Sequence, residues 1–377
     1  MTGWNKGTLL RKKKYYLELL RNEKDPKKVS LLYETINSID FIIDEITPRK
    51  NSKQQNCEVS YRDIIVNDAL FIKEFFEFTQ FVHHFRDAEK SQFFDVTEDL
   101  SKIDTSRGKI LTTTRNFYNS IKGPFKKQFK YLYLRADSIV NYRKLPYGVV
   151  NEYGNTYKVL HTNDIFMDVG YNNTLQDYCS SIHEFGHAIS LLTNPNHLEA
   201  SKFPLVEVDS IFFELIGNDF VGKQFNLEKD SILNSAYIFN DMLGTAHLLS
   251  AKLDAFSALT PKELYNKGVI RRYICSNSIF DKSDVDDVIY TSLCDYSQYT
   301  ISYLVAIELY MIYQDNPQFA LDLLNRIILL DEQNSIDYFN NLKELGIHPG
   351  EHINEYINII SERLDGVYEK KLQNRQV

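Results

Sequence analysis

The chain has 377 residues, of which 43% are hydrophobic and 25% charged, a composition typical of a globular protein with a substantial core. Its formal net charge of −8 predicts a generally acidic surface, which argues against nucleic acid as the main partner. No stretch has the apolar length of a membrane span, and the N-terminus lacks the apolar core of a secretion signal. The four cysteines are scattered without a Cys-x-x-Cys pair, which fits a reducing compartment. We therefore expect a cytoplasmic protein without a membrane partner.

Over most of the first 145 residues, the apolar side chains recur every three or four positions, as they do in amphipathic helices. The expected helices cover residues 9–22, 28–46, 61–94, 110–122 and 125–140. The pattern changes after Leu145, and this change is the nearest approach to a domain boundary. We therefore predict an N-terminal α-helical region over residues 1–145 and a second region over 146–377.

The second region begins with two short β-prone stretches, Tyr157–Leu160 and Ile165–Val169. In the second stretch, Ile165, Met167 and Val169 alternate with Phe166 and Asp168, which is the period of a half-buried strand. A turn at Gly170 then leads into a helix, for which Thr174 is a suitable N-cap. Further helices are expected at residues 205–220, 229–259, 261–275, 283–314, 317–332, 335–345 and 349–373. The sequence thus predicts a mainly α fold with a small β-sheet beside this first helix.

That helix carries the pattern His-Glu-x-x-His, here His183, Glu184 and His187. Positions i and i+4 of a helix lie on one face, so both imidazoles can reach one metal ion. Glu184 can then take a proton from a water molecule at the open coordination position. Chance is the alternative, because three fixed positions recur in roughly one chain in a hundred of this length. The residues around the motif must therefore decide between a metal site and a chance match.

A catalytic zinc site needs a third protein ligand, and the next expected helix offers Glu207. The helix, reversal and second helix between His187 and Glu207 would return that residue to the motif. Glu214 lies two turns further along the same face. These acids could instead be solvent-facing charges. Their neighbours are apolar, however, and buried acids need partners, for which a cation is well suited.

Three segments together resemble the catalytic core of the oligoendopeptidase F and thimet oligopeptidase family of zinc metallopeptidases: Tyr171–Asp177, His183–Ala188 and Glu207–Glu214. Thermolysin-like peptidases have a similar spacing but place an Asp four residues after the third ligand, where this chain has Ile211. The pattern Glu-x-x-Ser-x-x-x-Glu favours the oligopeptidase family. The chain is similar to a short member of it, with a zincin-type fold.

The resemblance implies a Zn²⁺ ion held by His183, His187 and Glu207, with Glu184 as the general base. It also implies that Glu214 does not bind the metal itself but orients one of the metal ligands.

The family also carries two tyrosines two helical turns apart that donate hydrogen bonds to the developing oxyanion. Tyr296 and Tyr303 match them. Family members often have a histidine shortly before these tyrosines, whereas residues 289–295 of this chain contain none. The resemblance therefore implies an oxyanion site that is weaker or differently built.

We therefore predict a zinc metalloendopeptidase that hydrolyses oligopeptides with a Glu184-activated, zinc-bound water. The Ile165–Val169 strand could hold the peptide by main-chain pairing, with Phe166, Asp168 and Gly170 as substrate-binding residues. Two alternatives stay open, a specialised maturation protease for one partner peptide and a zinc-binding homologue without activity. The oligomeric state is also left open.

Overall fold

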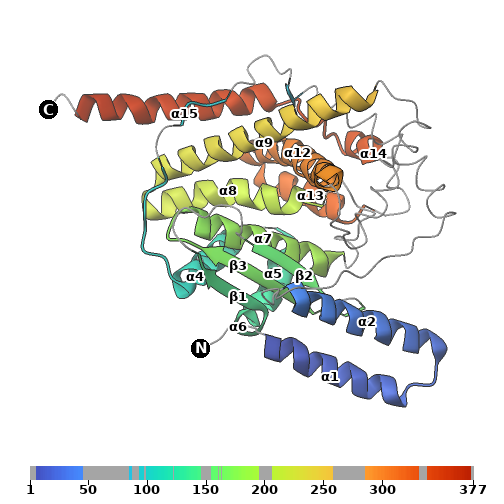
Figure 1. Ribbon diagram of the computed structural model, residues 1–377. Helices are drawn as coiled ribbons and strands as arrows, with labels where there is room; N and C mark the ends of the chain where they lie inside the picture. The colour runs from blue at the N-terminus through green and yellow to red at the C-terminus, as the bar shows by residue number, and fades with distance from the viewer. Residues whose placement is uncertain are drawn as a thin grey trace. The chain divides into compact units, whose positions relative to one another are not determined.

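The structure is a computed structural model of the chain. It describes residues 6–45, 85–86, 93–96, 99–121, 123–145, 154–159, 161–162, 164–194, 206–257, 285–330 and 338–374. Helices dominate these residues, beside one sheet of three strands, which confirms the predicted fold class (Figure 1). No helix among them is long and apolar enough to cross a membrane.

The chain divides into two compact units that do not follow the predicted boundary at residue 145. One unit joins Met1–Ser52 with Ser101–His197, and the other joins Lys53–Leu100 with Leu198–Val377. The physical reason is a strand pair that crosses the predicted boundary, because β1 (Val140–Lys144) pairs with β3 (Ile165–Tyr171). A sheet cannot be divided between domains without loss of its ladder hydrogen bonds.

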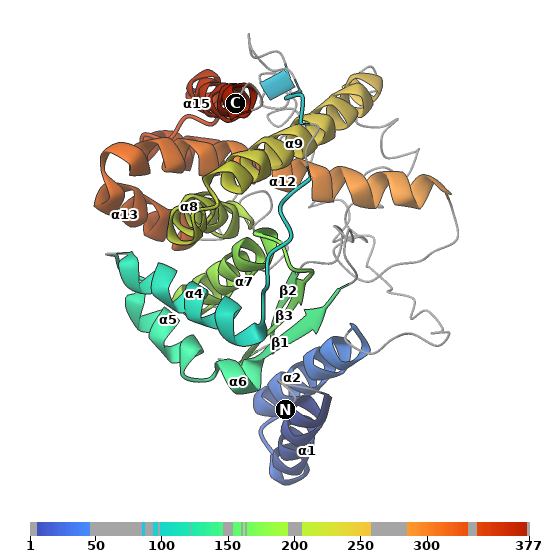
Figure 2. The same cartoon turned by 90° about the vertical axis from the view of Figure 1, so that its left-hand side faces the viewer.

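The first unit contains the sheet and the helices that cover it. Its helices are α1 (Lys6–Asn22), α2 (Pro26–Glu45), α4 (Arg107–Ser120), α5 (Lys126–Tyr133), α6 (Ala136–Ile139) and α7 (Gln176–Thr193). Helices α4 and α5 both contact α7, and α7 contacts the sheet (Figure 2).

The sheet has the order β1-β3-β2, with β3 parallel to β1 and antiparallel to β2 (Gly154–Lys158). The two predicted strands are confirmed as β2 and β3. The third strand was not predicted; it begins at Val140, the last residue of the helix expected over residues 125–140, and the helical part of that stretch ends at Ile139. Pairing with a distant strand decides the structure of β1, and local spacing does not report it.

The central strand β3 is buried on both faces, so the expected half-buried strand is corrected. Thr156 of β2 pairs with Met167, and Thr156 contacts α7, so residues of that register face α7. Tyr157 pairs with Phe166, and both belong to a core cluster with α1 and α2. Each face of β3 is thus covered by a different part of the unit.

The second unit is helical throughout its described part. Its helices are α8 (Val208–Phe225), α9 (Glu228–Ser257), α12 (Val285–Asp315), α13 (Pro317–Ile328), α14 (Tyr338–Glu344) and α15 (Ile353–Asn374). Helix α12 contacts α8, α9, α13 and α15, so it forms the centre of this unit. These helices confirm the predicted ones, except that the expected helix over residues 261–275 lies outside the described residues, as does most of 61–94.

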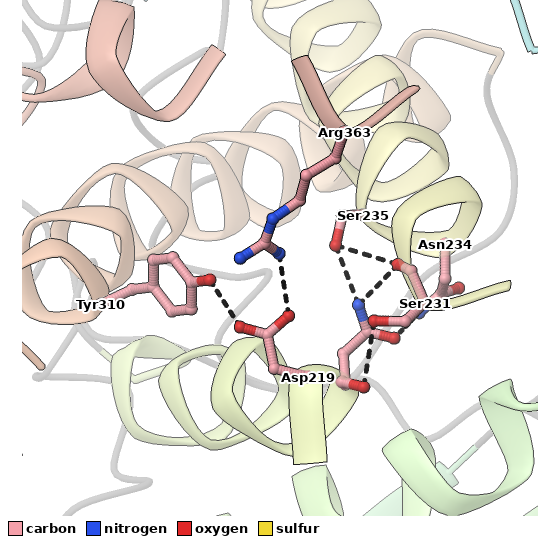
Figure 3. Close-up of polar contacts among 7 residues, drawn as sticks. Asp219, Ser231, Asn234, Ser235, Tyr310 and Arg363 are labelled. Carbon is pink, nitrogen blue, oxygen red and sulfur yellow. Dashed lines mark hydrogen bonds and ion pairs between the residues drawn. The ribbon is translucent and has the colours of Figure 1, made fainter. Parts of the chain in front are cut away.

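Two adjacent residues of α8 connect it to the helices around it (Figure 3). Asp219 accepts hydrogen bonds from the hydroxyl of Tyr310 at 2.6 Å and from Nη1 of Arg363 at 3.1 Å. Asn218 donates to the carbonyl oxygen of Ser231 at 2.8 Å. Polar bonds thus fix α8 to α12, α15 and α9.

Candidate metal centre

Helix α7, which carries the motif, is held by buried hydroxyl groups in the turn before His183. Thr114 of α4 donates to Oγ of Ser181 at 2.9 Å, and the hydroxyl of Tyr142 lies 3.1 Å from the same oxygen. Tyr118 donates to the carbonyl oxygen of Ile182 at 2.7 Å. Burial raises the pKa of Tyr142 to about 12, so its hydroxyl stays neutral at ordinary pH.

The beginning of α7 is fixed by Asp177, whose side chain is buried. Its carboxylate accepts from the N–H groups of Asn172 and Asn173, both at 2.8 Å, and from the hydroxyl of Thr105 at 2.5 Å. Burial raises the pKa of Asp177, and these three donors oppose the rise. The predicted N-cap Thr174 is wrong, because its hydroxyl donates to the side chain of Asn172.

The two motif histidines lie on one face of α7, as their spacing predicted. The ring centroids of His183 and His187 are 5.0 Å apart, and the ring planes are inclined by 82°. His187 is buried and His183 is partly exposed. Of the two rings, that of His183 is therefore the more accessible.

Glu184 lies between them in sequence and points toward β2. Its side chain is 5% exposed, and its Oε2 accepts a hydrogen bond of 2.6 Å from the hydroxyl of Thr156. Its Oε1 lies against Gly154, where an added Cβ would be only 2.3 Å away. The carboxylate is thus held between α7 and the strand beside it.

Glu207 is the residue immediately before α8, and it is buried. Ser210, one turn later, donates to Oε2 of Glu207 at 2.9 Å. The backbone N–H of Glu207 donates to the hydroxyl of Ser302 on α12 at 3.3 Å. The Glu-x-x-Ser spacing singled out in the sequence therefore has a local physical reason, since the serine orients the carboxylate.

Among the described residues, one set of three His, Cys, Asp or Glu side chains could hold a metal ion: His183, His187 and Glu207. One ligand atom from each lies within 4.8 Å of the other two. Two imidazoles and a carboxylate are a donor set that suits Zn²⁺, whereas Mg²⁺ and Ca²⁺ prefer oxygen ligands. The residues present therefore fit the metal that the motif predicted.

The two predicted oxyanion donors belong to α12. The side chain of Tyr296 lies outside the described residues. Tyr303 is 0% exposed and packs against Tyr356. Burial raises the pKa of Tyr303, and the nearby charge of Glu214 adds to the rise. Glu214, predicted to orient a ligand, therefore lies close enough to Tyr303 to influence its hydroxyl.

The predicted peptide-binding strand is corrected, because β3 is the central strand and is paired on both edges. Phe166 is 1% exposed within the cluster formed with α1 and α2. Asp168 is bound by Asn141 at 2.6 Å and by Arg143 at 2.5 Å. Gly170 is buried opposite Arg143. The side chains of Phe166 and Asp168 alternate with Met167, so they lie on the face of the sheet turned away from α7.

No protein-family model and no curated protein sequence matches the chain. Solved structures do. A protein provisionally named oligoendopeptidase F matches with a TM-score of 0.52 and 13% identity, over 93% of this chain and 66% of that one. PZ peptidase A, solved with an inhibitor, matches with a TM-score of 0.50 and 12% identity, over 89% of this chain and 65% of that one.

The fold is that of the oligoendopeptidase F type. The family resemblance found in the sequence motifs is thereby confirmed at the level of the fold. A provisionally named oligoendopeptidase F from Bacillus anthracis strain Ames also matches, with a TM-score of 0.46 and 14% identity, over 98% of this chain and 69% of that one. This chain thus covers about two thirds of the length of each of these three proteins.

Sequence reasoning missed Gly154 and Thr156, the two residues of β2 that touch Glu184. Both lie in an unremarkable stretch, Gly-Asn-Thr-Tyr-Lys. Alternation on a strand places positions 154 and 156 on one face, but it does not identify the helix that this face meets. No signal in a single sequence could have linked them to the motif.

Proposed function

We propose that the chain is a zinc-dependent metalloendopeptidase of the oligoendopeptidase F and thimet oligopeptidase family, acting on oligopeptides. The observation that carries the proposal is the set of three ligand atoms from His183, His187 and Glu207 within 4.8 Å of one another. A buried carboxylate, Glu184, lies directly beside the first of them in sequence. The fold adds support, because it is shared with peptidases.

A bound zinc ion would supply Lewis-acid polarisation of the scissile carbonyl and acidify the attacking water. Glu184 would accept a proton from that water on a carboxylate oxygen. It would then pass the proton to the amide nitrogen as the carbon–nitrogen bond breaks. Its low exposure favours this role, because few bulk water molecules compete for the carboxylate.

The tyrosines of α12 would donate hydrogen bonds where negative charge develops on the carbonyl oxygen. Tyr303 belongs to the same helix as Ser302, which accepts a hydrogen bond from the backbone of Glu207. Tyr296 is carried by the same helix two turns earlier. Glu214 would act on Tyr303 and a metal ligand through its charge.

Strand β2 takes over the role first expected of β3. One of its edges pairs with β3, and the other pairs with no described strand. A peptide that added to this edge would bind through its main chain, which accepts varied side chains. It would lie beside the strand that contacts Glu184.

Metal analysis and cleavage of an internally quenched peptide test the proposal together. The purified chain should contain about one zinc ion and lose activity with a chelator. Changing His183, His187 or Glu207 to Ala should remove the metal, whereas His348→Ala, at an exposed histidine, should keep it. Full zinc content in all three ligand variants would refute the assignment. Zinc binding without cleavage of any peptide would instead favour a zinc-binding homologue.

A further inference from the structure

The contact between β2 and Glu184 has two parts, and each involves a different oxygen of the carboxylate. Thr156 Oγ1 lies 2.6 Å from Oε2 of Glu184 and 3.1 Å from its backbone carbonyl oxygen. One hydroxyl has one proton, and the shorter contact to a charged oxygen is the stronger bond. Thr156 therefore donates mainly to the carboxylate.

The second part of the contact is the space above Gly154. A Cβ at this position would lie 2.3 Å from Oε1 of Glu184 and 2.7 Å from both Cδ and Cγ. Gly154 is absent from the described residues with positive φ, so its backbone conformation does not require glycine. The observed position of the Glu184 side chain requires it, because in this position the side chain occupies the volume that the Cβ of any other residue would fill.

Gly154 and Thr156 lie on the same face of β2, since alternate residues of a strand share a face. That face meets α7, because both residues contact Glu184. The strand thus restrains the Glu184 carboxylate in two ways: Gly154 packs against it, and Thr156 donates a hydrogen bond to it. A glutamate side chain otherwise has three rotatable bonds and would sample several positions.

We infer that Thr156 is a positioning residue that fixes the carboxylate of Glu184 for proton transfer, and that Gly154 provides the space for that position. The inference rests on the proposed role of Glu184 as the base. Thr156 does not touch the reacting atoms; it acts through Glu184. A displacement of about 1 Å in a catalytic group costs on the order of a hundredfold in rate, so the restraint has a measurable consequence.

The test uses four variants of the full chain. Thr156→Val keeps the shape and removes the hydroxyl, and kcat should fall by about tenfold to a hundredfold while KM changes by less than about twofold. Thr156→Ser keeps the hydroxyl and should recover most of the turnover. Gly154→Ala should reduce kcat as Thr156→Val does. Gly108→Ala is the matched control, because its Cβ would meet nothing within 4 Å.

Zinc content and melting temperature show whether each variant is intact. About one zinc ion per chain and a normal melting temperature in Thr156→Val would place the defect in the geometry of Glu184. Normal turnover in both Thr156→Val and Gly154→Ala would overturn the inference. A fall in Thr156→Val that Thr156→Ser does not recover would also overturn it, because the hydroxyl would then not be the cause.

A second measurement needs no activity. Thr156→Val is made in the metal-free parent and in a Glu184→Ala background, and the four melting temperatures form a double-mutant cycle. The valine should lower the melting temperature more where Glu184 is present, since only there does it remove a donor from a buried carboxylate as well as from the backbone carbonyl oxygen of residue 184. Equal effects in both backgrounds would refute the contact. If the cycle shows coupling between Thr156 and Glu184 but the chain cleaves no peptide, the contact is supported and the proposed function is refuted.

Discussion

A glutamine at position 184 has the shape of glutamate and lacks its ability to take a proton. Its amide oxygen could still accept from Thr156, so the side chain should stay in place. We expect Glu184→Gln to keep its zinc and to lose at least about a hundredfold in turnover, the usual scale for a general base. Kinetics of peptide cleavage with metal analysis would check this. Glu228→Gln, at an exposed position of α9, is the control, and near-normal hydrolysis by Glu184→Gln would sink the proposed mechanism.

Tyr303 poses a sharper question, because its side chain is 0% exposed. If the hydroxyl meets the oxyanion, Tyr303→Phe should reduce kcat on the order of a hundredfold with little change in KM. If it only packs, the variant should change the melting temperature and leave kcat alone. Tyr299→Phe is the control, since Tyr299 lies on the same helix and is 38% exposed. Normal kcat in Tyr303→Phe would remove this residue from the proposed oxyanion site.

At the scale of elements, a histidine and a buried glutamate join α12 to the beginning of α15. The backbone N–H of His352 donates to Oε1 of Glu308 at 2.9 Å, and Nδ1 of its ring contacts Oε2. The hydrogen bond from Glu308 raises the pKa of His352. Burial raises the pKa of Glu308, and the bonds from His352 oppose the rise. The charged pair therefore stabilises the junction while His352 is protonated.

The sign of the pH dependence follows from the raised pKa of His352. The contribution to stability is fully present below the unfolded-state pKa of about 6.5, and it is lost as the pH rises through the folded-state pKa. We expect His352→Asn to melt below the parent near pH 6, with a gap that shrinks toward about pH 9. Melting curves across this range would check it, with exposed His348→Asn as the control. A gap that widens with pH would contradict the assignment.

Local patterns predicted most helices and the motif face correctly, because their causes lie within a few residues. The bond from Ser210 to Glu207 is of this kind, as it spans one turn. Strand β1 and the contact of Thr156 with Glu184 join distant parts of the chain, and no local pattern reports them. Phe166 was misassigned for the same reason. Alternation divides the residues of a strand between two faces, but only the fold shows that α1 and α2 cover the face that carries Phe166.

For the whole molecule, a metal that binds only the folded chain should stabilise it. A concentration of zinc one hundred times Kd adds about 2.7 kcal/mol, enough to raise the melting temperature by a few degrees. We expect this rise when zinc is added to the metal-free parent, and we expect Glu207→Ala to lose most of it. Differential scanning calorimetry with buffered zinc would check both. The same rise in all three ligand variants would show that zinc binds elsewhere.

The divided first unit also affects how the chain leaves the ribosome. Leu9 and Ile39 of the N-terminal helices pack against Val159 and Phe166, which are synthesised much later. Phe94 belongs to the other unit, and its backbone forms two hydrogen bonds with Asn240, at 2.7 and 2.9 Å. Neither unit is built from one uninterrupted segment, so the first unit cannot close until the chain has been synthesised as far as residue 197. The apolar faces of α1 and α2 therefore stay uncovered until Val159 and Phe166 have been synthesised. Chaperones that bind nascent chains should matter more for this protein than for one whose domains follow each other in sequence.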